Sequence, residues 1–217
     1  MDPDIARRLF FEDLAGRWDA LQSTERPQRL AELLAPFQEL LQRAECLLDL
    51  GTGTGALLPL LAQRVPRGRL VAVDLALAML QRAAQRSTSA ALVQGDVHAL
   101  PFDAARFDLI VCHAALPHFA DKPRALRSLH RVLRPHGHLL ILHDTDRETV
   151  NRIHTDLPAP LNSDLLPPVT ELRVLLTEAG FVVLQADEVG EQVIVVARAE
   201  PASFCAAGPS PSQQPAR

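Results

Sequence analysis

From Cys46 onward, short apolar runs alternate with segments in which apolar residues recur every three or four positions. The short runs have the length of buried strands, and the spaced segments have the period of amphipathic helices. Strands are predicted at 46–50, 70–74, 91–94, 107–112, 138–143, 181–186 and 193–197. Helices are predicted at 5–14, 30–41, 56–64, 76–86, 122–133 and 170–179, and another begins near Asp146.

This order of elements predicts the class of fold. Strands that alternate with helices form βαβ units, which build a parallel sheet covered by helices on both faces. A turn at Gly190 joins the last two strands into a hairpin. We therefore expect an α/β protein with a doubly wound, seven-stranded, mostly parallel sheet that ends in an antiparallel hairpin. Ligands of such sheets bind outside the carboxyl ends of the strands.

Changes in composition and in the pattern of apolar residues divide the chain into three parts. Residues 1–45 are predicted to form a helical lid, and residues 46–199 the α/β domain that binds the ligand. Residues 200–217 are rich in Pro, Ala, Ser and Gln, and we expect them to be a disordered tail.

The first predicted strand ends in the segment Asp49-Leu50-Gly51-Thr52-Gly53-Thr54-Gly55. Glycines at alternate positions allow a tight turn and a close approach of the backbone to a ligand. The second strand ends at Asp74, where a carboxylate can accept hydrogen bonds from both hydroxyls of a ribose. A nucleotide-like ligand is therefore expected at this edge of the sheet.

The third strand is followed by Asp96 and Val97. The carboxylate of Asp96 is placed to bind an adenine amino group, and the side chains of Leu75 and Val97 are placed on the two faces of the ring. The order and spacing of these fragments together indicate a nucleotide-like ligand more specifically than any single fragment does.

Together with Phe107-Asp108 and Arg131 to Pro135, these motifs make the segment from Phe10 to Arg198 resemble a class I S-adenosylmethionine-dependent methyltransferase. Residues 11–19 are similar to the lid of the quinone-biosynthesis-like branch, of the methyltransferase-domain 11/25 type. The resemblance implies a Rossmann-like fold and methyl transfer to a small-molecule acceptor. One departure is the sequence Pro135-His136-Gly137, where the family usually has Pro-Gly-Gly.

The resemblance also implies roles for single residues. Asp49, Gly51, Gly53 and Gly55 would lie along the methionine part of the cofactor, Asp74 at the ribose, and Asp96 with Val97 at the adenine. Leu75 and His113 would border the same cofactor.

Two other functions stay open. The run from Gly51 to Ala56 also satisfies the G-x-G-x-x-A fingerprint of NAD-dependent oxidoreductases. Against this, the acidic Asp49 stands where a dinucleotide site favours an apolar residue, because the pyrophosphate is an anion. The other alternative is a protein that binds S-adenosylmethionine without catalysing a reaction.

Histidines gather on the predicted acceptor side. His113 and His143 end two neighbouring strands, so both are expected to point into one crevice, with His118 and His154 nearby. Three hypotheses compete: solvated or backbone-bonded imidazoles, acid–base catalysis by His113, His118, His143 and His154, or a zinc or iron site. The metal ligands would be His143 and His154 with His118 or Asp144.

Composition narrows the cellular context. The chain has 217 residues, of which 47% are hydrophobic and 22% charged, which is typical of a soluble globular protein. The net charge of −4 and a pI near 6.0 weigh against a nucleic-acid partner. Residues 1–4 lead into no apolar signal segment, and Cys46, Cys112 and Cys205 show no paired spacing. A cytoplasmic enzyme without a membrane partner is expected, and a homodimer is compatible with the sequence.

Overall fold

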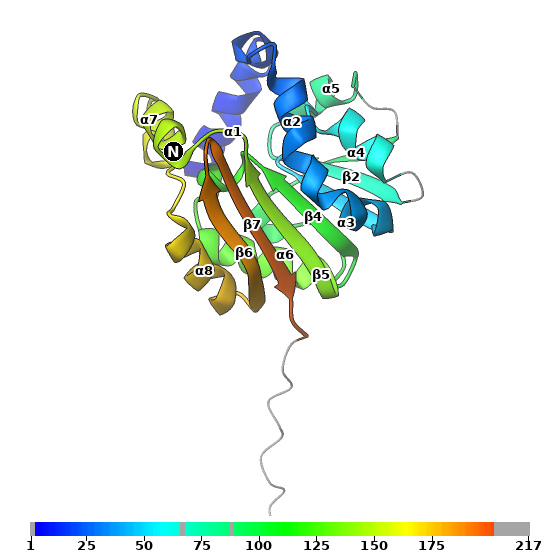
Figure 1. Ribbon diagram of the computed structural model, residues 1–217. Helices are drawn as coiled ribbons and strands as arrows, with labels where there is room; N and C mark the ends of the chain where they lie inside the picture. Colours follow the sequence, from blue (N-terminus) through cyan, green and yellow to red (C-terminus); the bar gives the residue numbers. More distant parts are fainter. Residues whose placement is uncertain (1–2, 66–67, 87–88, 202–217) are drawn as a thin grey trace, which may run out of the picture.

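The computed structural model describes residues 3–65, 68–86 and 89–201, and these form one seven-stranded sheet with helices on both sides (Figure 1). The strands are β1 (Cys46–Leu50), β2 (Arg69–Asp74), β3 (Ala90–Gln94), β4 (Phe107–His113), β5 (Leu133–His143), β6 (Phe181–Val189) and β7 (Gln192–Ala199). Their order in the sheet is β3-β2-β1-β4-β5-β7-β6. Strands β1 to β5 run parallel, and β7 is antiparallel to β5 and β6. The predicted class of fold is confirmed.

The described α-helices are α1 (Pro3–Leu14), α2 (Arg26–Leu34), α3 (Gln38–Arg43), α4 (Leu58–Arg64), α5 (Leu77–Ala83), α6 (Lys122–Val132), α7 (Arg147–Thr155) and α8 (Val169–Glu178). Short 3-10 turns lie at Trp18–Leu21, Ala35–Phe37, Val97–Ala99, Leu116–His118 and Leu161–Ser163. The helix predicted at 30–41 is split into α2 and α3 by the turn that contains Pro36, since proline lacks the N–H that a continuous helix needs.

Side chains of the sheet fill two cores, one on each face. Leu48 and Ile110 point to the face covered by α6 and α8. Their neighbours Leu47 and Leu109 point to the opposite face, where they pack against α2, α3 and α4 (Figure 1). This alternation follows from the two-residue repeat of a strand. It explains why strands buried on both faces appear in the sequence as unbroken apolar runs.

Two motif positions, Asp108 and His136, lie away from the ligand edge. The Asp108 carboxylate in β4 accepts hydrogen bonds from the N–H groups of Glu45 and Cys46, both at 3.0 Å, and so fixes the start of β1. His136, which replaces the usual glycine of the family, has a φ of +65° in the left-handed region. Strand β5 begins at Leu133, earlier than predicted, and its first part is irregular because its register against β4 shifts between Phe107 and Leu109.

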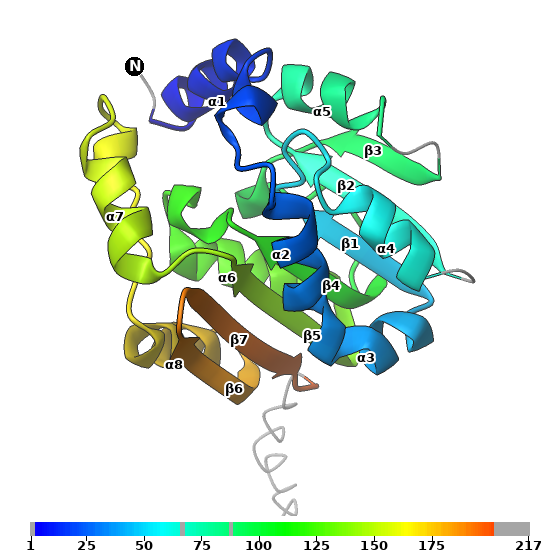
Figure 2. The same ribbon diagram turned by 45° about the horizontal axis from the view of Figure 1, so that its top comes forward.

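Helix α1 is fastened to the edge of the sheet at which the parallel strands end (Figure 2). The Glu12 carboxylate accepts hydrogen bonds from the N–H groups of Leu77 and Ala78, both at 2.7 Å. An acidic group stabilises the first turn of a helix because the N–H groups there are unpaired and carry partial positive charge. Glu12 thus caps α5 from a distant part of the chain and holds the N-terminal segment over the strand ends.

No helix in the described ranges is long and apolar enough to cross a lipid bilayer. The predicted tail falls largely on residues 202–217, which include Cys205 and lie outside the described residues. The division at residues 45 and 199 stays a prediction. Helices α2 and α3 share one apolar core with β1 and β4, so this part of the predicted lid packs on the sheet.

Candidate functional site

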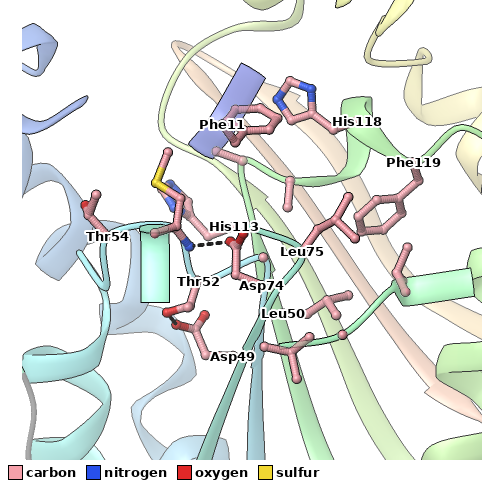
Figure 3. Close-up of a pocket in the computed structure, with 18 of the residues that line it drawn as sticks. Phe11, Asp49, Leu50, Thr52, Thr54, Asp74, Leu75, His113, His118 and Phe119 are labelled. Carbon is pink, nitrogen blue, oxygen red and sulfur yellow. Dashed lines mark hydrogen bonds between the residues drawn. The ribbon is translucent and has the colours of Figure 1, made fainter. Parts of the chain in front are cut away.

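A cavity lies at the carboxyl ends of β1, β2 and β4, beneath the N-terminal segment. In Figure 3, Asp49 and Thr52 lie at one end of it, and Phe11 and His118 lie at the other. The walls come from the ends of successive strands and from α1 and α2. This is the place at which parallel α/β sheets bind their ligands.

The loop after β1 is held by backbone hydrogen bonds to β2. The N–H groups of Gly51 and Thr52 both donate to the carbonyl of Val73, at 2.8 and 3.0 Å. Gly51 has a φ of +67°, and a side chain on it would overlap the methyl group of Ala115. Gly53 has a φ of +55°, and no atom lies within 4 Å of the place where its Cβ would be. The open side of Gly53 lets a ligand approach the backbone closely.

Asp49 lies below this loop, and its side chain is almost fully buried, at 2% exposure. Its carboxylate accepts a 2.6 Å hydrogen bond from the Thr52 hydroxyl. Among the described residues, no cationic side chain forms an ion pair with it. Burial therefore raises the pKa of Asp49 to about 7. A buried carboxylate without a cation, on the wall of a cavity, fits the ammonium group of a ligand.

Asp74 and Asp96 follow at the ends of the next two strands. The two oxygens of Asp74 accept hydrogen bonds from the N–H groups of Ala76, at 2.9 Å, and Gly53, at 2.8 Å. Burial raises the pKa of Asp74. Asp96 accepts a 2.7 Å hydrogen bond from Nδ1 of His98, whose Nε2 accepts one from the N–H of Asp121. The two hydrogen bonds of His98 therefore fix its ring, and the ring orients Asp96.

The cavity brings together nearly all of the predicted cofactor residues. Those on its wall are Asp49, Gly51, Gly53, Asp74, Leu75, Asp96, Val97 and His113. Gly55 is not among the lining residues. A Cβ on Gly55 would lie 3.0 Å from Ala83 of α5, so this glycine serves the packing of a helix.

His113 forms a buried pair with Asp144. Its Nε2 lies 3.0 Å from an oxygen of Asp144. Burial opposes ionisation of this carboxyl, but the hydrogen bond from His113 and the charge of Arg26 outweigh it and lower the pKa of Asp144. Because an ionised carboxylate only accepts hydrogen bonds, Nε2 of His113 donates its proton to Asp144.

His118 forms a second pair, with Asp164. Its Nδ1 lies 3.0 Å from an oxygen of Asp164, which also binds the Arg7 guanidinium at 2.6 Å. The two hydrogen bonds outweigh burial and lower the pKa of Asp164, so Nδ1 of His118 donates its proton. The ring centroids of Phe11 and His154 each lie 4.8 Å from that of His118. The carboxylate and the two rings fix the orientation of the imidazole.

His143 and His154 are buried but do not line the cavity. The register pairs His113 with Leu142, so the next residue, His143, points to the opposite face of the sheet. This register corrects the expectation that His113 and His143 share one crevice. Burial lowers the pKa of His143 to about 3, with a further contribution from His113. Burial also lowers the pKa of His154, so both imidazoles are neutral at pH 7.

The predicted metal ligands do not come together. Within the described residues, the one group of three candidate ligands whose atoms all lie within 4.8 Å of one another is Asp4, Asp96 and His98. His118, His143 and His154 form no such group, although Nε2 of His143 and Nδ1 of His154 have no hydrogen-bond partner. These three histidines therefore do not fit a metal ion in this arrangement.

Sequence reasoning missed the charged groups that the N-terminal helices bring to the cavity. Arg7 and Arg26 both line it. In the sequence they are two of many scattered arginines, with no motif around them. Asp164 was missed as well, because its partners Arg7 and His118 lie 157 and 46 residues away along the chain.

Comparisons with known proteins agree with this geometry. The methyltransferase domain family matches residues 48–141. The malonyl-[acyl-carrier protein] O-methyltransferase of Halorhodospira halophila is 39% identical over 135 residues, which cover 60% of this chain and 45% of that protein. The demethylmenaquinone methyltransferase of Thermotoga maritima is 34% identical over 144 residues, covering 63% and 60%. The chain therefore matches about half of the length of these relatives.

Solved structures share the fold. A SAM dependent methyltransferase from Aquifex aeolicus has a TM-score of 0.66 and 23% identity, and the match covers 85% of this chain and 97% of that one. A SAM-dependent methyltransferase from Thermotoga maritima, described as a possible histamine N-methyltransferase, has a TM-score of 0.69 and 21% identity, covering 88% and 98%. At these identities the likeness shows the fold alone.

Asp49 makes stability depend on pH in an unusual direction. Its pKa of about 7 lies above the ordinary value of 3.8, so the folded chain binds this proton more tightly than the unfolded chain does. Stability is therefore fully present below about pH 4 and is lost as the pH rises to about 7.

The variant Asp49→Asn, which retains an oxygen for the Thr52 hydroxyl, lacks this titration. Between pH 5 and pH 8, its free energy of unfolding should rise relative to that of the wild type by about 2–3 kcal/mol. Urea unfolding of both proteins at the two pH values measures the change. A difference that stays constant with pH would show that Asp49 is ionised throughout.

Proposed function

The chain belongs to the class I S-adenosylmethionine-dependent methyltransferases, and from this premise we propose that it methylates a small-molecule acceptor in the cavity. The observation that carries the proposal is the buried carboxylate of Asp49. It lies under an open glycine loop, in one cavity with the carboxylates of Asp74 and Asp96. A cationic amino group, a ribose and an adenine would meet these three carboxylates in turn.

S-adenosylmethionine would supply a methyl group made electrophilic by its positively charged sulfur. The residues of the chain then have three tasks: to bind, to align and to exclude water. Asp49 would neutralise the ammonium group, and Asp74 would accept hydrogen bonds from the ribose hydroxyls, while its hydrogen bond from Gly53 keeps the loop in place. Leu75 and Val97 would flank the adenine, and Asp96, which His98 orients, would bind its amino group.

His118 is our proposed base on the acceptor side. It lines the cavity next to Phe11, and its bond to Asp164 leaves Nε2 to take a proton from the acceptor. The ionised Asp164 stabilises the imidazolium that results. His113, which is paired with Asp144, orients the acceptor or replaces His118 as the group that takes the proton. His154 and His143 act indirectly, His154 by packing on the His118 ring.

A small acceptor suits the site because residues of α1 and the side chain of Trp18 line the cavity and limit its space. Of the two relatives, one is named for demethylmenaquinone, which supports a small-molecule acceptor, and the other for an acyl group on the acyl-carrier protein. A metal at His118, His143 and His154 is not part of the proposal, because their ligand atoms do not converge. A cytoplasmic location, a homodimer and the absence of a nucleic-acid partner stay predictions.

Calorimetric titration with S-adenosylmethionine, S-adenosylhomocysteine and NAD, on protein first assayed for bound metal, tests the choice of cofactor. We expect micromolar binding of the first two and none of NAD, since Asp49 would repel a pyrophosphate. Asp49→Asn should weaken S-adenosylhomocysteine about 10- to 100-fold by removing a charged partner. Binding of NAD alone would make the protein an oxidoreductase. Binding of S-adenosylmethionine without turnover of any acceptor would favour a non-catalytic protein.

His118→Gln should lower kcat by about 10²- to 10⁴-fold with the acceptor that screening identifies, because the proton acceptor is lost. The Kd of S-adenosylhomocysteine should stay within about twofold. His130→Gln is the matched control: His130 bonds to the backbone of Glu200 and does not line the cavity. Equal activity of the two variants would exclude His118 as the base.

A further inference from the structure

Arg7 holds the carboxylate that orients His118. Its guanidinium donates from Nε to both oxygens of Asp164, each at 3.0 Å, and from Nη2 to one of them at 2.6 Å. The side chains of Arg7 and Asp164 are only 8% and 1% exposed, although the two residues lie 157 positions apart. A forked contact of this kind is among the strongest hydrogen bonds between charged groups in proteins. The two charges therefore balance each other inside the protein.

The charge that His118 meets depends on this balance. Oδ2 of Asp164 accepts a 3.0 Å hydrogen bond from Nδ1 of the imidazole. A buried carboxylate without a cation would favour a second proton on His118, because opposite charges attract strongly where water is excluded. When Arg7 balances the carboxylate, the imidazole needs no positive charge. A base requires this state, since only a singly protonated imidazole can take a proton.

Other titratable side chains around His118 and Asp164 do not replace Arg7. They come from several elements and are Asp4, Asp74, Lys122, His143 and His154. Burial lowers the pKa of His143 and of His154, so neither adds a charge at neutral pH. The Lys122 ammonium donates to the carbonyls of Pro117 and Phe119. Within the described residues, Arg7 is the one arginine or lysine that is hydrogen-bonded to Asp164.

The other His–Asp pair of the cavity, His113 with Asp144, has no such fork. Nε of Arg26 and Nη2 of Arg29 lie 3.8 and 3.6 Å from an oxygen of Asp144, and both distances are longer than a hydrogen bond. Asp144 therefore attracts its guanidinium groups at a distance, whereas Asp164 is bound by one directly. The forked contact belongs to the histidine that is the proposed base.

The geometry points to Arg7 as a positioning residue for His118: by balancing Asp164, it keeps the imidazole singly protonated, with its proton on Nδ1. Nε2 can then take the proton that the acceptor releases as its nucleophilic atom bonds to the methyl group and the bond from that group to sulfur breaks. This inference rests on the proposed function and adds to it the residue that keeps the base ready. The protonation of His118 can be measured without an acceptor.

The test is ¹⁵N NMR of the full chain with labelled histidine, because the ring-nitrogen shifts distinguish the imidazolium from each neutral tautomer. The signals of His118 are assigned by their loss in His118→Gln. At pH 7.5 the wild type should carry one proton on this ring, at Nδ1. In Arg7→Met, the ratio of doubly to singly protonated His118 should rise about 10- to 100-fold, because the buried carboxylate has lost its cation.

Two further variants separate the charge of Arg7 from its packing. Adding Asp164→Asn to Arg7→Met removes the second charge as well, so the ratio should return to within about threefold of the wild type. Arg7→Gln keeps an N–H donor for Asp164 without the charge. It should show the same rise as Arg7→Met, and it takes the place of that variant if Arg7→Met does not fold.

Glu12→Gln is the matched control. Glu12 also fastens α1, through the N–H groups of Leu77 and Ala78, but it does not line the cavity. Its loss should lower the melting temperature and leave the protonation ratio of His118 within about twofold. An equal rise of the ratio in Glu12→Gln and Arg7→Met would show that α1 acts only by covering the site, which would overturn the inference.

Kinetics with the acceptor that screening identifies complete the test. At pH 7.5, Arg7→Met should lower kcat about 10- to 100-fold and leave the KM of the acceptor within about threefold. The loss should shrink as the pH rises, because the second proton leaves His118, whereas a purely structural loss would not. An unchanged protonation ratio in both Arg7 variants, or a doubly protonated His118 in the wild type, would overturn the inference. A higher ratio with full activity would instead exclude His118 as the base and leave the charge balance intact.

Discussion

The rest of the site depends on the course of the backbone between β1 and α4. Gly51 is bound to β2 through Val73 and passes so close to Ala115 that no side chain fits there. This close approach places Gly53 next to Asp74 and leaves Asp49 buried below the loop without a cation. A single loop conformation thus creates the space for a ligand and leaves a buried carboxylate on the wall of that space.

The acceptor side is built differently, from parts that lie far apart in the chain. Helices α1 and α2 contribute Arg7, Phe11 and Arg26, and the segment after α7 contributes Asp164. The buried ion pair of Arg7 and Asp164 joins α1 to that segment and also fixes His118. Removing one partner of such a pair is far more costly than its net contribution to stability. The position of α1 and the orientation of the proposed base are therefore linked.

The fold and the cofactor edge could be predicted because their signals are local. Apolar runs predicted the strands, and Asp49, Asp74 and Asp96 lie at or just after the ends of three of them. The acceptor side could not be predicted in the same way. Whether His143 faces the cavity is decided by the register of β5 against β4, which shifts near Phe107. A shift of one residue moves every side chain to the other face of the sheet.

Two further features of the site could not be derived from the sequence, for physical reasons of the same kind. Gly55 belongs to the glycine motif, yet it serves the contact with α5, because motif spacing does not distinguish a ligand from a neighbouring helix. Arg26 carries no sequence signal, because its importance comes from burial and from sharing Asp144 with Arg29. Burial and charge balance are properties of the folded chain and become visible only there.

The most direct test of the central claim is a crystal structure of the protein with S-adenosylhomocysteine. The account predicts the amino group at Asp49, the ribose hydroxyls at Asp74 and the adenine between Leu75 and Val97. Density for the ligand outside this cavity, or with its amino-acid end turned away from Asp49, would contradict it.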